Sequence, residues 1–352
     1  MRSLPLPRRS GPRALRAHRT AAALATAVLL LSGAPAVAAA EGAPDRDFTI
    51  KDPRITESSG LAASRIHPGV YWTHNDSAHP PYIYAVDSRT GETVATVTLE
   101  GIGDIRDAEA ISLGPDGNLY VGDIGDNLDG SWDHVWIYRF PEPEQLKDVT
   151  VRPTQFTVRY ADGPRDAESM MVHPKTGRVY IASKNRSGGG LYEGPEKLTA
   201  SGTNTFRRIG EVPWVTDGAF SPDGEELTFR SYFSARTYAW KDGGRLGGHR
   251  AVSAPLQRQA ESVTYTADGR ALMFGTEGAH SGVVRVDIAK GTGSGSGADD
   301  GAAGKGSGGA ASSGGTGDGS GGRGNATLGA FVLAAAAALF FGFRRLRGRT
   351  KG

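Results

Sequence analysis

The phrase Asp107-Ala-Glu-Ala-Ile111 recurs, with small changes, along the middle of the chain. Its other copies are Glu57-Ser-Ser-Gly-Leu61, Asp166-Ala-Glu-Ser-Met170, Asp217-Gly-Ala-Phe220 and Gln259-Ala-Glu-Ser-Val263. The copies stand 43 to 59 residues apart, and an apolar run follows each of them. Self-similarity at such a spacing is typical of repeat architectures, so each copy marks the start of a structural repeat.

A hairpin signal follows most copies of the phrase. The turns Gly114-Pro-Asp-Gly117, His173-Pro-Lys-Thr-Gly177, Ser221-Pro-Asp-Gly224 and Thr266-Ala-Asp-Gly269 each separate two apolar, alternating runs. Glycine at the end of such a turn supplies the backbone conformation that a tight connection between antiparallel strands requires. Each repeat therefore begins with a β-hairpin.

The pattern predicts an all-β, five-bladed β-propeller over residues 41–290. Third strands such as 82–86 and 135–139, and fourth strands such as 93–99 and 155–160, complete four-stranded repeats of about 50 residues, the size of a propeller blade. The fifth repeat lacks its outer strand, and the run 47–51 supplies one, so we expect the N-terminal strand to close the last blade. Six blades remain the alternative, because the interval between residues 109 and 168 is long.

The N-terminus predicts secretion. Residues 1–20 carry six arginines and no acid, and an apolar run and small residues up to Ala40 follow. This order is that of a secretory signal peptide over 1–40, with a retained N-terminal anchor as the alternative.

The C-terminus predicts a membrane anchor. Residues 291–325 are Gly- and Ser-rich and indicate a disordered stalk; residues 326–343 are 18 residues without a charge, and 344–352 carry five basic residues. An 18-residue helix rises about 27 Å, close to the hydrocarbon thickness of about 30 Å. Because basic tails prefer the cytoplasm, we predict a single-pass protein in the cell membrane whose propeller faces the extracytoplasmic side.

Charge narrows the range of partners. Residues 41–290 hold 27 basic and 35 acidic side chains, a net charge of −8, and the chain has no cysteine. An acidic domain disfavours nucleic acid and favours cations. Because the chain has no cysteine, we expect a domain without disulfides. We further expect a monomer that contacts the membrane through its C-terminal helix. Its binding partner would be a protein, a glycan or a small anionic ligand.

The repeated glutamate predicts an acidic ring. The innermost strands of a propeller line its channel, so Glu57, Glu109, Glu168 and Glu261 are expected to converge, while Gly218 interrupts the ring. The ends of the second strands bring Asp76, Asp123 and Glu277 to the same face. They also bring His74, Lys184 and Arg230, which we expect to bind a ligand. Carboxylates without cysteine suit hard cations such as calcium.

Two alternatives stand beside this prediction. Glutamate at a repeated position also caps strands and ties neighbouring blades together, which would make the ring structural. A second acid-rich stretch, Asp123 to Asp133, places oxygen donors at alternate positions before Gly130, as calcium loops do, but it lacks their closing glutamate.

The Ala-Glu-Ser phrases, the Pro-Asp-Gly turns and Trp72-Thr-His-Asn-Asp76 resemble secreted bacterial propellers of the TolB-like and phytase-like groups, including the domain called esterase-like activity of phytase. The resemblance implies calcium over the channel and hydrolysis of phosphate esters. It would make ligands of Glu57, Asp76, Glu109, Asp123, Glu168 and Glu261.

The sequence thus leaves two functions open. The first is a membrane-anchored binding or interaction module with a cation at the acidic channel mouth, since no complete catalytic set is present. The second is a calcium-dependent phosphoesterase, which rests on the acidic mouth and the resemblance.

Overall fold

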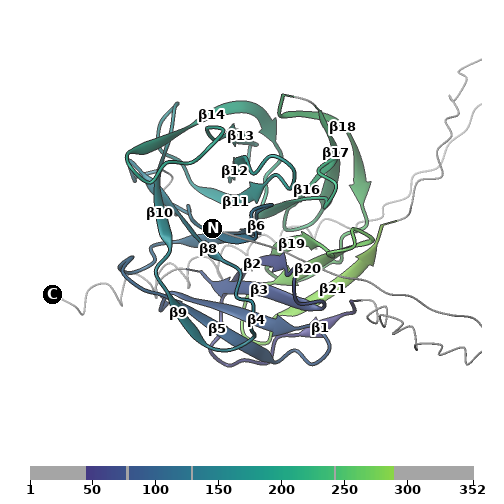
Figure 1. Ribbon diagram of the computed structural model, residues 1–352. Helices are drawn as coiled ribbons and strands as arrows, with labels where there is room; N and C mark the ends of the chain where they lie inside the picture. The colour runs from purple at the N-terminus through teal and green to yellow at the C-terminus, as the bar shows by residue number, and fades with distance from the viewer. Residues whose placement is uncertain (1–44, 77–78, 128–129, 242, 289–352) are drawn as a thin grey trace, which may run out of the picture. The chain divides into compact units, whose positions relative to one another are not determined.

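Twenty-one β-strands and no helix make up the residues described by the computed structural model, which are 45–76, 79–127, 130–241 and 243–288 (Figure 1). They all belong to the first of two compact parts of the chain, Met1–Lys290. Within them no helix is long and apolar enough to cross a membrane. The predicted signal peptide, stalk, membrane helix and basic tail lie outside the described residues.

Each repeat is a four-stranded antiparallel meander. Repeat one contains β2 (Ser58–Ala63), β3 (Val70–Asn75), β4 (Tyr82–Asp87) and β5 (Thr93–Leu99). Repeat two contains β6 (Ala108–Leu113), β7 (Asn118–Asp123), β8 (Val135–Pro141) and β10 (Thr154–Tyr160). Repeat three contains β11 (Ala167–Val172), β12 (Val179–Ser183), β13 (Gly189–Glu193) and β14 (Thr203–Val212).

The remaining strands form two further repeats of the same kind. Repeat four contains β15 (Asp217–Phe220), β16 (Glu226–Arg230), β17 (Ala235–Lys241) and β18 (Arg245–Val252). Repeat five contains β19 (Ala260–Tyr265), β20 (Ala271–Thr276), β21 (Gly282–Asp287) and, from the N-terminus, β1 (Phe48–Thr49).

The N-terminal strand closes the last sheet, as predicted. Strand β1 pairs antiparallel with β21, Phe48 opposite Val283 and Thr49 opposite Gly282. The next residue, Ile50, donates its backbone N–H to the Ser281 carbonyl at 2.9 Å and is itself buried. This pairing covers an edge that β21 would otherwise expose.

Two parallel contacts connect neighbouring repeats at the outside. Strand β10 pairs with β14, which joins repeats two and three into one eight-stranded sheet. The short strand β9 (Val149–Val151) pairs with β5 of repeat one. The long interval between residues 109 and 168 therefore contains β9 as an addition to the sheet of repeat one.

The first strands of the repeats lie around the centre and the last strands at the periphery (Figure 1). Strand β2 contacts β6, β6 contacts β11, β11 contacts β15, β15 contacts β19, and β19 contacts β2 again. The apolar core is divided in the same way, because each of its five clusters combines side chains of two successive repeats. The described chain is therefore an all-β, propeller-like ring.

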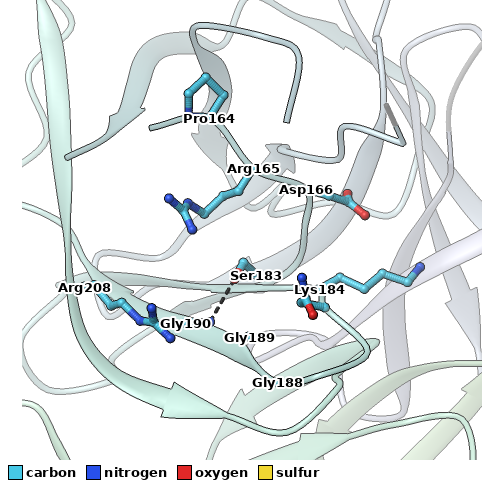
Figure 2. A pocket seen from close by; sticks show the side chains of 10 residues that line it. Pro164, Arg165, Asp166, Ser183, Lys184, Gly188, Gly189, Gly190 and Arg208 are labelled. Atoms are coloured by element: carbon cyan, nitrogen blue, oxygen red, sulfur yellow. Dashed lines mark hydrogen bonds between the residues drawn. The ribbon is translucent and has the colours of Figure 1, made fainter. Parts of the chain in front are cut away.

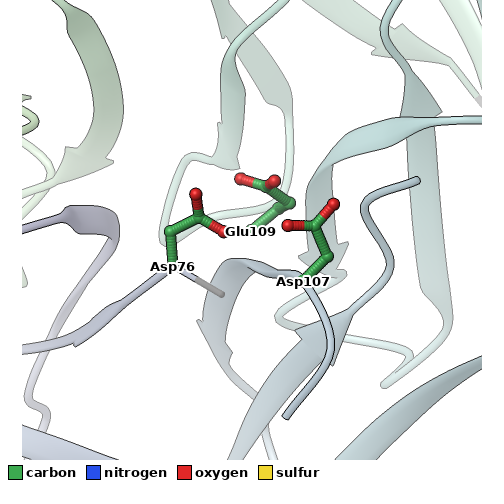
Figure 3. Close-up of side chains that lie close together, drawn as sticks. All are labelled: Asp76, Asp107 and Glu109. Atoms are coloured by element: carbon green, nitrogen blue, oxygen red, sulfur yellow. The ribbon is translucent and has the colours of Figure 1, made fainter. Parts of the chain in front are cut away.

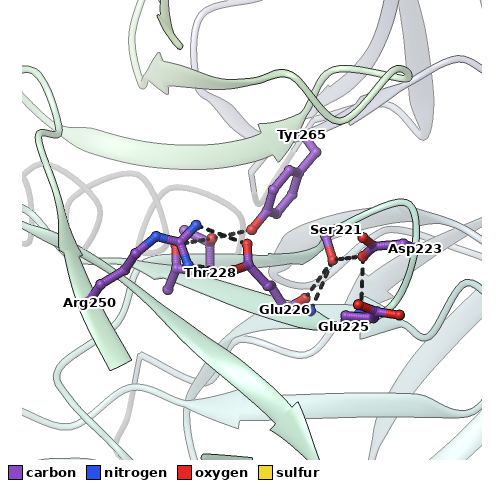
Figure 4. A network of polar contacts seen from close by, with 8 residues as sticks. Ser221, Asp223, Glu225, Glu226, Thr228, Arg250 and Tyr265 are labelled. Carbon is purple, nitrogen blue, oxygen red and sulfur yellow. Dashed lines mark hydrogen bonds and ion pairs between the residues drawn. The ribbon is translucent and has the colours of Figure 1, made fainter. Parts of the chain in front are cut away.

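Polar contacts add to the packing between repeats four and five (Figure 4). The Thr228 hydroxyl on β16 lies 2.7 Å from the Tyr265 hydroxyl on β19. On the outer strand β18, the Arg250 guanidinium forms a two-pronged ion pair with Glu226 of β16. The first contact links repeat four to repeat five, and the second ties the outer strand of repeat four to its second strand.

Candidate functional site

The repeated glutamates are the extra residues of β-bulges. The pairing between first and second strands slips by one residue at Glu109, at Glu168 and at Glu261. A bulge re-aims the side chain of its extra residue and interrupts the ladder locally. These glutamates are 6%, 2% and 9% exposed, so the bulges place three carboxyl groups in the interior at the same end of the ring.

Repeat four departs from this pattern. Its register is regular, with Asp217 opposite Arg230 and Gly218 opposite Phe229. The Asp217 carboxylate accepts hydrogen bonds from the backbone N–H groups of Gly218 at 2.7 Å and Val263 at 2.8 Å. Asp217 thus links β15 to β19 and does not join the ring.

The structure corrects the alignment of the first phrase. Just past the second strand of each of these repeats, a backbone N–H donates to the carbonyl of Glu57, Asp107, Asp166 or Gln259. Glu57 therefore corresponds to Asp107, and Ser59 holds the position of Glu109. The Ser59 hydroxyl donates to Glu109 Oε2 at 3.2 Å, while the Glu57 carboxylate pairs with His79 at 2.9 Å.

Lys184 lies among the buried carboxyl groups. Its ammonium is 2.6 Å from Glu168 Oε1 and 5.7 Å from the ring centre of Tyr232. Burial acts to lower the pKa of Lys184, but the charges of Glu168, Tyr232, Glu109 and Glu261 outweigh burial and raise it. Lys184 is therefore an ammonium held by acids from several repeats.

One lysine does not balance the acids that surround it. Burial, followed by the charge of Glu168, raises the pKa of Glu109 and of Glu261 well above the ordinary value. Burial raises the pKa of Glu168 to about 7 although Lys184 opposes the shift. Burial and the charges of Asp76 and Glu57 raise the pKa of Glu277 to about 7. We call this group of interacting residues the acidic mouth: Glu57, Asp76, Asp107, Glu109, Asp166, Glu168, Glu261 and Glu277, around Lys184.

Three carboxylates of the acidic mouth come together as metal ligands do. One oxygen from each of Asp76, Asp107 and Glu109 lies within 4.8 Å of the other two (Figure 3). Asp76 follows β3 of repeat one, whereas Asp107 and Glu109 stand at the start of β6 in repeat two. Oxygen ligands alone, drawn from two neighbouring sheets, suit calcium or another hard divalent cation.

The other predicted site residues occupy different surroundings. Asp123 is fully buried and accepts the backbone N–H of Asp107 at 2.7 Å. Arg230 donates to the carbonyls of Ser262 at 2.7 Å and Gly275 at 2.8 Å, across the boundary between repeats four and five. His74 is buried, and burial lowers its pKa, so the imidazole is neutral.

The acid-rich stretch after β7 is folded on itself. The Asp126 carboxylate accepts hydrogen bonds from the Ser131 hydroxyl at 3.0 Å and the Trp132 backbone at 2.6 Å. Asn127 donates to Asp107 Oδ2 at 2.9 Å, so the stretch borders the three-carboxylate cluster. Asp129 of the predicted calcium loop lies outside the described residues.

One site residue escaped the sequence analysis. Asp107 belongs to the three-carboxylate cluster, whereas Glu277 reaches the acidic mouth from the end of β20, as expected for a residue after a second strand. The signal for Asp107 was present, because an acid stands two residues before the repeated glutamate at Asp107 and again at Asp166. The two-residue offset between Glu57 and the repeated glutamate hid this second acidic row.

A pocket of about 240 Å³ lies in repeat three beside the acidic mouth (Figure 2). It is lined by Pro164, Arg165, Asp166, Ser183, Lys184, Asn185, Gly188, Gly189, Gly190 and Arg208.

Comparison with known proteins does not assign a family. No protein-family model matches the chain, and no curated protein matches it. Among solved structures the chain is similar to hydrazine synthase of Kuenenia stuttgartiensis, with 15% sequence identity, a TM-score of 0.35 and coverage of 64% of this chain. The match spans 58% of that protein's chain, and at this TM-score it carries no argument about function.

Proposed function

We propose that this protein is an extracytoplasmic binding module, built on a five-bladed β-propeller and anchored in the membrane by residues 326–343. Its binding face is the acidic mouth, where a hard divalent cation such as calcium is held by Asp76, Asp107 and Glu109. The observation that carries the proposal is the approach of these three carboxylates, from two repeats, to within 4.8 Å of one another.

The blade count is supported by the division of the core. Five apolar clusters alternate with the sheets, and each cluster is shared by two successive repeats, including the last and the first. A sixth blade would need a further four-stranded repeat between two of these clusters. The interval after Glu109 contains β9 instead, a strand of three residues.

The cation is supported by charge balance. A buried carboxylate is stable only if a proton, a hydrogen-bonded partner or a cation compensates its charge. Lys184 supplies one positive charge to the acidic mouth, and burial raises the pKa of Glu109, Glu168, Glu261 and Glu277. A divalent cation would supply the missing charge at neutral pH, where protons are scarce.

Binding fits the described residues better than catalysis. The arginines that could grip a phosphate ester at the mouth have other partners: Arg230 donates to backbone carbonyls, and Arg106 lies between the rings of Trp132 and Trp136 at 4.1 and 3.8 Å. The calcium-dependent phosphoesterase remains the second candidate, because it would use the same cation.

Calorimetric titration of calcium into the metal-free full-length chain tests the proposal. We expect one site, weakened at least tenfold, or about 1.4 kcal/mol, by Asp107→Asn and by Glu109→Gln. Asp116→Asn is the control, because Asp116 lies in the β6–β7 turn at the opposite end of the same repeat and should leave the affinity unchanged. Absence of calcium binding, or equal loss in the control, would contradict the proposed site.

Two further assays separate the remaining parts of the proposal. Release of phosphate from p-nitrophenyl phosphate, dependent on calcium and abolished by Glu109→Gln, would favour the phosphoesterase over the binding module. For the anchor, removal of residues 326–352 should release the protein from the membrane fraction of cells. Retention of the truncated chain in that fraction would contradict a C-terminal anchor.

A further inference from the structure

The pocket of repeat three is opposite in charge to the acidic mouth beside it. Its lining contains Arg165, Lys184 and Arg208 against one acid, Asp166. In Figure 2 the side chains of Lys184 and Asp166 extend away from those of the two arginines. Lys184 pairs with Glu168, and Asp166 accepts the backbone N–H of Asp126, so both side chains serve the mouth. The pocket itself retains the two guanidinium groups, of which Arg165 pairs with Asp162 and Arg208 lies 3.7 Å from the Glu211 carboxylate.

The first guanidinium is held firmly in place. Arg165 lies 4.8 Å above the ring centre of Tyr192 and pairs with Asp162 Oδ1 at 2.9 Å. The Tyr192 hydroxyl donates to the other oxygen of Asp162 at 3.1 Å. This triangle fixes Arg165 before any ligand arrives, which lowers the entropic cost of binding.

The second guanidinium belongs to a residue that a bulge brings opposite Tyr192. The pairing of β13 with β14 slips between Leu191 and Tyr192, and the slip brings Arg208 directly opposite Tyr192. Burial raises the pKa of Tyr192 to about 12, while Arg165 and Arg208 both act against that rise. The Tyr192 hydroxyl therefore lies within electrostatic reach of a guanidinium from each of two segments.

Bare backbone forms the rest of the pocket. A Cβ on Gly189 would lie 1.9 Å from the Ser183 carbonyl oxygen, and a Cβ on Gly190 would lie 2.7 Å from the Tyr192 ring. Strand packing thus requires these glycines, and their lack of side chains leaves the hollow open. The pocket has a volume of about 240 Å³, several times the volume of about 30 Å³ that one water molecule occupies in the liquid. It therefore has room for a small oxyanion and its waters.

We infer that the pocket formed by Arg165, Arg208 and Gly188 to Gly190 binds a small tetrahedral oxyanion, either free phosphate or sulfate or the same group on a larger ligand. Guanidinium N–H groups form charge-assisted hydrogen bonds with such oxyanions. Since Nε and Nη2 of Arg165 donate to the Gly163 carbonyl, Arg165 would offer its Nη1 to the ligand. The site is separate from the cation site, since none of its anchoring side chains belongs to the three-carboxylate cluster.

The test follows the backbone amide resonances of Gly188, Gly189 and Gly190 in the full-length chain as inorganic phosphate, sulfate or phenyl phosphate is added. Chelator is present throughout, so the result does not depend on the cation site. We expect saturable shifts, with binding weakened at least fivefold by Arg208→Gln. Tighter binding of phenyl phosphate than of phosphate would indicate that the natural ligand carries the group as an ester; equal binding would indicate the free ion.

The matched control is Arg207→Gln. Arg207 precedes Arg208 on β14, is also exposed, and stands opposite Glu193 in the ladder between β13 and β14. Its loss changes the net charge equally and should alter the affinity less than twofold. No saturable shift with any of the three probes, or the same weakening in both variants, would overturn the inference.

Discussion

The acidic mouth should make the folded chain less stable as pH rises when no divalent cation is present. The pKa of Glu168 is about 7 in the folded chain and about 4.5 in an unfolded one. The folded chain therefore keeps a proton that the unfolded chain releases between these values. The contribution of Glu168 to the free energy of unfolding must fall as pH rises from about 4.5 to about 7, and stay level above that window.

The size of this effect follows from the same values. Glu168 is 2% exposed, so solvent does not screen its charge. At about 1.4 kcal/mol per pH unit, its ionisation costs the folded state about 3 kcal/mol between pH 4.5 and 7. The raised pKa of Glu277 acts in the same direction. Glu168→Gln removes the first contribution, so the variant should lose about 3 kcal/mol of the pH dependence.

The assay is urea unfolding of both chains at pH 5, 6, 7 and 8 in chelator. Glu225→Gln is the control, because that side chain is 71% exposed in a turn at the opposite end of the ring. The control should reproduce the wild-type slope with pH. A wild-type stability that rises between pH 5 and 8, or an equal slope in Glu168→Gln, would refute the reasoning.

Three further substitutions test how the ring is held together, each by urea unfolding at pH 7. Arg230→Met leaves the Ser262 and Gly275 carbonyls without their buried donor, and should cost about 3 kcal/mol; a loss below 1 kcal/mol would contradict the tie between repeats four and five. Tyr265→Phe removes the hydrogen bond to Thr228 and should lower the free energy of unfolding by about 1 kcal/mol. An unchanged free energy of unfolding would contradict a stabilising role of this hydrogen bond. Ile50→Ala opens a cavity beside the closing strand and should cost about 3 kcal/mol and speed proteolysis near residue 48; an unchanged cleavage rate would argue against closure by β1.

The repeat pattern was sufficient to predict much of the fold. Turns such as Ser221-Pro-Asp-Gly224 and the alternation of apolar residues are local signals, and the structure places β-hairpins at those positions. The pairing of the N-terminal strand with β21 followed from an incomplete last repeat. The parallel contacts of β9 and β10 could not be predicted in this way, since they join strands of different repeats that are far apart in the sequence.

The site was predicted less completely, because side-chain direction depends on bulges. A bulge inserts one extra residue into a strand without a distinctive sequence signal. The sequence pattern alone therefore pairs Glu57 with Glu109, although Ser59 holds that position in the structure. Arg230 has the polarity of a ligand-binding residue, yet its neighbours in space are backbone carbonyls. Contacts of that kind arise from packing between repeats, which a single sequence does not encode locally.

The central claim is that carboxylates from neighbouring repeats converge to hold a cation. A crystal structure of the chain soaked in calcium tests it most directly. We predict one ion bound by oxygens of Asp76, Asp107 and Glu109 at about 2.3–2.6 Å, the usual calcium–oxygen distance. Calcium found instead in the stretch after β7, or no ion among these carboxylates at saturating concentration, would contradict the account.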